Sequence, residues 1–114
     1  MQEIFHHLIK AERFTKDFKS FAAAADSRDS SVRTVFRCDV TAGKGDEQDW
    51  IFVETEGDGF LYNMVRNIVG TLVDIGTGRW QPEKITEILQ ARTRTAAGLL
   101  APASGLCLMW IKYD

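Results

Sequence analysis

Residues Gly57 to Gly78, GDGFLYNMVRNIVGTLVDIGTG, decide the fold that we expect of this chain. At about 100° per residue, the apolar side chains of this stretch gather on one face, which is typical of a helix packed on a protein core. That face consists of Leu61, Met64, Val65, Ile68, Leu72 and Ile75, with Tyr62, Val69 and Val73 widening it on one side. Glycines near both ends supply the permissive backbone that such ends favour. The stretch therefore predicts one long amphipathic core helix.

Arg66 lies at the edge of this apolar face, next to Tyr62 and Val73. The opposite side carries Asn63, Asn67, Gly70 and Asp74. A guanidinium at the margin of an apolar face is costly to desolvate, so we expect it to have a carboxylate or phosphate partner. Asp74 is eight residues further along, on another side of the helix. A partner from outside the long helix is therefore favoured.

Length and composition bound the class of protein. The 114 residues predict a single domain over 1–114, and 45% hydrophobic residues fit a globular fold. Fourteen basic against 16 acidic residues give a net charge of −2, which does not favour general binding of nucleic acid but leaves room for a local basic patch. Cys38 and Cys107 lack metal-ligand spacing, and there is no signal peptide or long apolar run. We expect a soluble, cytoplasmic protein with free thiols, no metal and no membrane partner.

Two helical segments are expected at the start of the chain. Gln2–Arg13 has apolar residues at helical spacing. His6 and His7 are adjacent within it and point in different directions, which favours solvated positions over metal ligands. A second helix would have Thr15 as its N-cap and would end near Asp26. Its inward residues would be Phe18, Phe21, Ala22 and Ala25.

A hairpin is expected before the long helix. Residues Val32–Thr41 alternate with period two, the pattern of a half-buried strand, and Trp50–Glu56 resumes a run of aromatic and branched residues. One face of the first strand would carry Val32, Thr34, Phe36, Cys38 and Val40, and the other Arg33, Val35, Arg37, Asp39 and Thr41. Arg33 and Arg37 are a candidate phosphate-contacting strip. A solvated sheet face explains them equally well.

The rest of the chain is expected to add a helix and a strand. Pro82 leads into a short helix over Glu83–Ala91, with Ile85, Ile88 and Leu89 inward. Arg92 and Arg94 follow it, where the helix dipole favours cations. After a loop, Leu106–Tyr113 is apolar on both faces, which predicts a buried, central strand beside the hairpin and under the long helix. The order predicts an α+β fold: an antiparallel or mixed sheet packed on one face by helices, the long core helix among them.

Most catalytic motifs are missing: there is no phosphate-binding glycine loop, paired-cysteine metal site, GxSxG elbow or HExxH motif. Five blocks nevertheless resemble, in the same order, the C-terminal part of the TruA-type tRNA pseudouridine synthases. The blocks are KDFKSF (16–21), SVRTV (31–35), GFLYNMVRNIVGTLVDIGTGRW (59–80), AAGLLAPASGL (96–106) and IKY (111–113). They extend over nearly the whole chain, so the resemblance implies a pseudouridine synthase-like half as the fold.

The resemblance further implies an enzyme that isomerises uridine to pseudouridine in the anticodon arm of tRNA. An aspartate attacks the flipped-out nucleotide, the base detaches and turns, and it is rejoined through carbon, without metal or organic cofactor. Arg66 falls on the arginine of the family motif FLxxMVR, which pairs with that aspartate. We also expect RNA contacts from Arg33, Arg37, Arg79 and Arg94, and an active-site wall from Phe60, Leu61 and Met64. A homodimer is implied as well.

The sequence departs from the family at several places. The nucleophile motif GRTDAGVHA of the family's N-terminal half is absent, as is a counterpart of its active-site tyrosine. The pattern GxHDF reads FTKDF over 14–18, and the DR before the AG loop reads Thr93-Arg94. We therefore expect this chain to be the C-terminal domain, inactive without the N-terminal half as its partner. The alternatives are a stand-alone RNA-binding module, which the upstream coding sequence would distinguish, and a dimerisation module.

Overall fold

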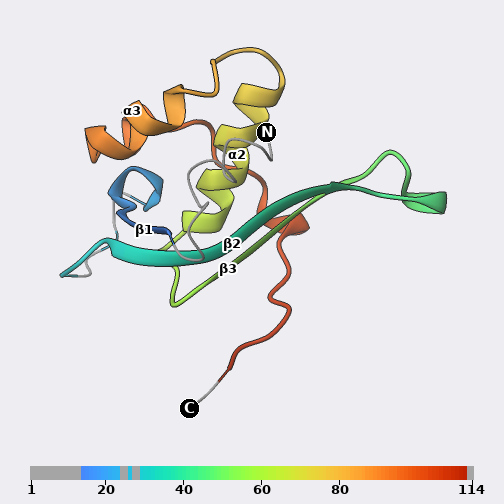
Figure 1. The fold of residues 1–114 in the computed structure, drawn as a ribbon, viewed down its shortest axis with the longest axis horizontal. Coiled ribbons are helices and arrows are strands. Elements are labelled where there is room, and N and C mark those ends of the chain that lie inside the picture. The colour runs from blue at the N-terminus through green and yellow to red at the C-terminus, as the bar shows by residue number, and fades with distance from the viewer. Residues whose placement is uncertain (1–13, 24–25, 27–28, 113–114) are drawn as a thin grey trace.

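The computed structural model describes residues 14–23, 26 and 29–112. Its three strands, β1 (Phe14–Asp17), β2 (Val32–Ala42) and β3 (Ile51–Gly57), form an antiparallel sheet in the order β1-β2-β3. Two helices, α2 (Met64–Gly76) and α3 (Lys84–Ala91), cover one face of the sheet, and β2 and β3 extend beyond them as a two-stranded arm (Figure 1). The predicted α+β fold is confirmed. The helix expected over Gln2–Arg13, with His6 and His7, lies outside the described residues.

The segment expected to form a second helix begins as a strand, so that prediction is wrong. Phe14–Asp17 pairs antiparallel with β2, and the hydroxyl of Thr15 hydrogen-bonds that of Thr34 at 2.7 Å instead of capping a helix. Only a 3-10 turn, Lys19–Phe21, follows. Pairing across the sheet satisfies the backbone of this segment and outweighs its helical spacing. Of the inward residues, Phe18, Phe21 and Ala22 are buried as predicted, and Ala25 lies outside the described residues.

The expected hairpin of β2 and β3 is present, but the alternation of β2 is interrupted. Its register with β3 shifts between Val35 and Arg37, the mark of a β-bulge. Val35 and Cys38 therefore both face the core, with 1% and 2% of their surface exposed. Strict alternation placed these two residues on opposite faces of the strand. The predicted faces are therefore wrong for the residues before the bulge, where Val35 is buried and Val32 is exposed. Burial raises the pKa of the Cys38 thiol to about 11.

α2 begins at Met64 and not near Gly57, so the long helix is shorter at its N-terminal end than predicted. β3 continues to Gly57, and a connection then leads to Asn63, whose φ of 62° is left-handed. A left-handed residue cannot belong to a right-handed helix, so α2 starts directly after it. The predicted C-terminal end near Gly76 is confirmed.

α2 is buried on two sides. The predicted apolar face is confirmed in the core residues Met64, Ile68, Leu72 and Ile75. The polar side is buried as well: Asn67 and Thr71 are each 1% exposed, and Asn67 Nδ2 donates to the Phe21 carbonyl at 2.8 Å. Tyr62 and Val73, which were expected to widen the apolar face, are instead more than half exposed. The helix is therefore held from both sides.

α3 follows the prediction closely. It spans Lys84–Ala91, and its inward residues Ile85 and Ile88 are buried. The segment after it is a loop, as expected, and carries two 3-10 turns, Arg94–Ala96 and Ala103–Gly105.

The C-terminal segment is not a strand, so the prediction of a buried central strand is wrong. Residues 106–112 are exposed and have no sheet partner among the described residues. The exposed large apolar side chains are Leu106, Leu108, Met109, Trp110 and Ile111, with exposures between 52% and 76%. Figure 1 shows this segment leaving the body of the molecule. An apolar pattern indicates that a segment favours burial, but it does not say against which partner.

Candidate active site around Arg66

Arg66 lies in the first turn of α2, where a loop from a distant part of the sequence meets the helix. Its Nε donates to the Ala101 carbonyl at 2.7 Å, and its Nη1 donates to Asn63 Oδ1 at 3.2 Å. The Ala101 amide donates in return to the Arg66 carbonyl at 3.2 Å. Two oxygens from separate segments thus fix the direction of a partly buried guanidinium.

The loop of residues 98–101 is bound closely to α2. The Gly98 amide donates to Thr71 Oγ1 at 2.9 Å. Gly70 faces the Leu99 carbonyl so closely that an added Cβ would lie 1.5 Å from that oxygen. Only glycine allows such an approach of backbone to backbone. The helix and the loop therefore act as one unit, which brings a loop carbonyl to the guanidinium.

Arg66 has no carboxylate partner in the part of the chain that the structure describes. Both of its side-chain acceptors are neutral oxygens. Asp74, which its position along the helix made a poor partner for Arg66, forms an ion pair with Arg79 at 3.3 Å instead. Ala101 and Asn63 thus orient the guanidinium of Arg66 without neutralising its positive charge. An incoming carboxylate would gain charge-assisted hydrogen bonds there.

The two arginines of β2 have different surroundings. Arg33 donates to two backbone carbonyls. Arg37 forms ion pairs with three carboxylates, those of Asp39, Glu54 and Glu56, at 2.7, 3.1 and 3.5 Å. The hydrogen bonds with Asp39 and then with Glu54 raise the pKa of Arg37 above its usual value. The surroundings of Arg37 are net negative, which disfavours a phosphate more than the surroundings of Arg33 do.

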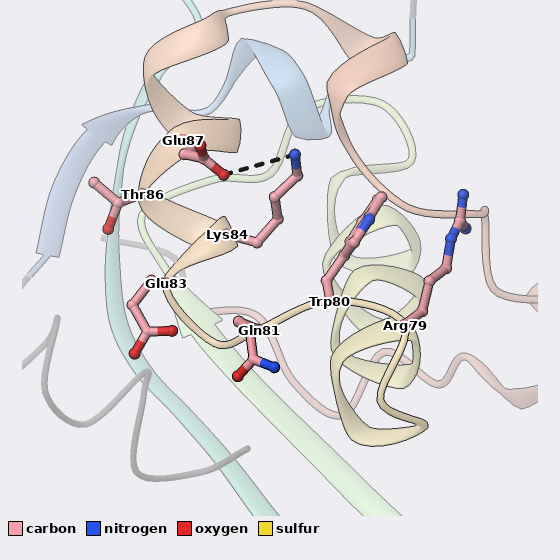
Figure 2. A pocket seen from close by; sticks show the side chains of 7 residues that line it. All are labelled: Arg79, Trp80, Gln81, Glu83, Lys84, Thr86 and Glu87. Atoms are coloured by element: carbon pink, nitrogen blue, oxygen red, sulfur yellow. Dashed lines mark ion pairs between the residues drawn. The ribbon is translucent and has the colours of Figure 1, made fainter.

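Arg79 lines an open pocket in the α2 to α3 connection, where it and Lys84 flank the ring of Trp80 (Figure 2). The guanidinium carbon of Arg79 lies 4.7 Å from the ring centroid, and the ammonium nitrogen of Lys84 lies 5.5 Å from it. Each cation also has a carboxylate: Asp74 pairs with Arg79, and Glu87 pairs with Lys84 at 3.6 Å. These contacts tie the connection to both helices.

The four arginines that were expected to contact RNA come from separate elements of the fold. Arg33 and Arg37 lie on β2, whereas Arg79 follows the C-terminal end of α2. Arg94 opens the turn after α3 and forms no ion pair with the residues that the structure describes. Its neighbour Arg92 lies 3.8 Å from the Asp17 carboxylate.

The residues expected to form a cleft wall differ in how much surface they offer. Leu61 and Met64 are 3% and 0% exposed and belong to the core. Phe60 packs against the same core but is only partly buried. A role in a cleft wall stays a prediction for all three, and Phe60 has the most surface for it.

Asn63 and the Ala101 carbonyl belong to the site although the sequence pattern did not predict them. An asparagine just before a helix is a usable signal, because asparagine is common at N-caps and tolerates left-handed backbone. The Ala101 carbonyl could not be found in this way, since a backbone oxygen has no signature in the sequence.

No helix in residues 14–23, 26 and 29–112 has both the length and the apolar character that crossing a membrane requires. Within the same ranges, no three side chains of His, Cys, Asp or Glu are arranged so that they could hold a metal ion. The two cysteines are free thiols, as expected, with Cys38 buried and Cys107 exposed.

The chain matches a known family of proteins. The model of the tRNA pseudouridine synthases matches residues 15–114. This chain belongs to the tRNA pseudouridine synthase family. The resemblance carried by the five sequence blocks is thereby confirmed.

Curated members of the tRNA pseudouridine synthase family are similar over most of the chain. The tRNA pseudouridine synthase A of Bacillus subtilis (strain 168) is 42% identical over 114 residues, which are all of this chain and 43% of that protein. The enzymes of the same name from Thermotoga neapolitana and Thermoanaerobacter sp. (strain X514) are 48% and 46% identical, over 81% and 87% of this chain. These matches cover 36% and 39% of the two relatives. The chain thus spans about two fifths of the length of these synthases.

Proposed function

We propose that this chain is the C-terminal domain of a tRNA pseudouridine synthase and supplies its active-site arginine, Arg66. One observation carries the proposal: the Arg66 charge is oriented by two neutral oxygens, and no described residue offers it a carboxylate. In the complete enzyme, meaning the longer protein that contains this chain, an aspartate from outside this sequence would take that place. The substrate would be a uridine in the anticodon arm of a tRNA in the cytoplasm.

Arg66 would act on the state and direction of that aspartate. A cation beside a carboxylate favours its ionised form, which is the form that can attack the nucleotide. The carboxylate would bond to the ribose C1′ as the bond from C1′ to N1 of the base breaks. The base would then turn and rejoin C1′ through C5 as the bond between C1′ and the carboxylate breaks, while the C5 proton is lost and N1 gains one. No cofactor enters this sequence of steps. Extruding the nucleotide costs unstacking energy, which contacts between protein and RNA must offset.

We propose that Arg33 and Arg94 contact tRNA phosphates more strongly than Arg37 and Arg79. The guanidiniums of Arg37 and Arg79 already have carboxylate partners. Releasing such a guanidinium to a phosphate leaves its carboxylate unpaired near a polyanion, which is unfavourable.

The exposed C-terminal segment supports a second part of the proposal, that the remainder of the complete enzyme packs against residues 106–111. Curated relatives are more than twice as long as the matched region. The large apolar side chains of this segment are each more than half exposed. Contact with the remainder would remove this apolar surface from water.

The same surface favours a second candidate function, a dimerisation module without catalysis. In that case a second copy of the chain would cover residues 106–111. Sedimentation of the purified chain at several concentrations separates the two: a strictly monomeric result argues against dimerisation through this segment.

The experiment that tests the main proposal is Arg66→Ala in the complete enzyme. We expect kcat for pseudouridine formation to fall about 100-fold or more, as when a charge-stabilising group is removed from an active site. The Kd for tRNA should stay nearly unchanged, because the partner of Arg66 is a catalytic carboxylate and not a phosphate. Arg33→Ala is the matched control, with a loss mainly in binding. Equal losses of turnover and binding for Arg66→Ala would instead assign it to a phosphate contact.

A further inference from the structure

We propose that Asn63 is a positioning residue that holds in a fixed direction the end of the Arg66 guanidinium that meets the incoming carboxylate. The inference rests on the proposed function of Arg66 and adds a residue to it. Asn63 occupies the N-cap of α2, directly beside the first turn that carries Arg66. Its contacts differ from those of an ordinary N-cap asparagine.

The side chain of Asn63 does not make the usual N-cap hydrogen bond. An N-cap asparagine normally accepts a hydrogen bond from a free amide of the first helical turn. Asn63 makes no such bond, and its Oδ1 accepts from Arg66 Nη1 at 3.2 Å instead. Its backbone is left-handed, with φ of 62° and ψ of 9°. This conformation is uncommon for a residue with a side chain, though asparagine tolerates it better than most.

The acceptors of Arg66 leave a defined set of donors for a ligand. A guanidinium has five N–H groups, of which Nε carries one and each Nη carries two. The Nε–H group donates a hydrogen bond to the Ala101 carbonyl, and one N–H group of Nη1 donates to Asn63 Oδ1. Nη2 donates no hydrogen bond to any of the described residues. The remaining donors are therefore both protons of Nη2 and one of Nη1.

This distribution determines how a carboxylate can bind with two hydrogen bonds. Such a fork needs donors on two nitrogens, either Nε with Nη2 or Nη1 with Nη2. The first pair is blocked, because the Nε proton is engaged by Ala101. The end of the guanidinium formed by Nη1 and Nη2 keeps a free proton on each nitrogen, so we assign the carboxylate to this end. Asn63 holds that end in a fixed direction.

The variant Asn63→Gly tests this inference cleanly. Glycine adopts a φ near 62° without the cost of a Cβ, so the variant removes the amide while keeping the backbone conformation. In the complete enzyme we expect kcat to fall about tenfold, the order of effect that the loss of one orienting hydrogen bond produces. The KM for tRNA and the Tm should stay unchanged. A kcat equal to that of the unmodified enzyme would overturn the inference.

A double-mutant cycle distinguishes positioning from a separate role. If Asn63 acts through Arg66, Asn63→Gly should have no further effect on the single-turnover rate of Arg66→Ala. A full additional tenfold loss in that background, or a fall in Tm that accompanies the loss, would assign Asn63 another role and overturn the inference.

The same measurements separate this inference from the function on which it rests. If Arg66→Ala lowers kcat and Asn63→Gly does not, only the positioning role fails. If Arg66→Ala leaves kcat unchanged, the proposed function fails, and the positioning role fails with it.

Discussion

The apolar face of α2 and the C-terminal segment of residues 106–111 have similar compositions and opposite surroundings. Ile68 and Leu72 of α2 are each 1% exposed, whereas Leu108 and Met109 are 73% and 76% exposed. The helix finds its partners within the described chain, namely the sheet on one side and the loop of residues 98–101 on the other. The C-terminal segment has none among the described residues. Both regions are therefore apolar, and they differ in whether the described chain packs against them.

The difference separates the part of this chain whose contacts lie within the chain from the part whose apolar surface is left exposed. Around Arg66 the helix and the loop hold the guanidinium with contacts that lie entirely within the described residues. Along residues 106–111 the chain presents apolar surface that only another part of a protein could cover. The domain therefore builds its arginine site by itself and, under our proposal, depends on the rest of the enzyme for its C-terminal segment.

The substitution expected to change stability most is Leu108→Asp in the complete enzyme, and it tests whether residues 106–111 are covered there. If the remainder of the enzyme covers residues 106–111, the substitution buries an unpaired charge and should lower the free energy of unfolding by about 4 kcal/mol or more. Urea unfolding of the complete enzyme measures it.

Leu108→Met is the matched control, since it keeps an apolar side chain of similar size and should cost less than about 1.5 kcal/mol. A Leu108→Asp enzyme as stable as its parent would mean that the segment stays exposed in the complete enzyme. In that case the comparison with α2 would describe a permanent difference between the two regions.

A smaller effect is expected from Gly70→Ala, which sharpens the comparison on the side of α2. The added methyl group would meet the Leu99 carbonyl, so the loop must move away from the helix. We expect overpacking to lower the free energy of unfolding by about 1–3 kcal/mol. Because the loop carries the Ala101 carbonyl to Arg66, kcat should fall as well.

Gly105→Ala serves as the control for this substitution, since an added Cβ there meets nothing within 4 Å. Circular dichroism with urea titration reports the stability of both variants. Gly70→Ala with full stability and full activity would show that the loop does not need its close approach to α2.

Much of the fold follows from local pattern, and the errors have separate causes. The hairpin, the apolar face of α2 and the inward residues of α3 were predictable, because their period records which side is buried. β1 was mistaken for a helix because its pairing with β2 is a contact between distant residues. The bulge at Val35 and Arg37 was missed because one extra residue shifts the faces of a strand without changing its composition.

The candidate site was predictable in its charged residue and not in its surroundings. Arg66 was found because a cation beside an apolar face requires an explanation. Asn63 was placed on the far side of the helix, since its left-handed backbone was not foreseen. The Ala101 carbonyl depends on how the loop folds back, which no local pattern encodes. A local backbone conformation accounts for the first omission, and a tertiary contact accounts for the second.

The central claim is that this chain supplies an oriented arginine but not the nucleophile. The most direct test is pseudouridine formation on tRNA by the purified chain of residues 1–114, followed as loss of the uridine C5 hydrogen. The account predicts no product from the chain alone and recovered activity once the remainder of the enzyme is added. Robust turnover by the 114-residue chain by itself would contradict the account.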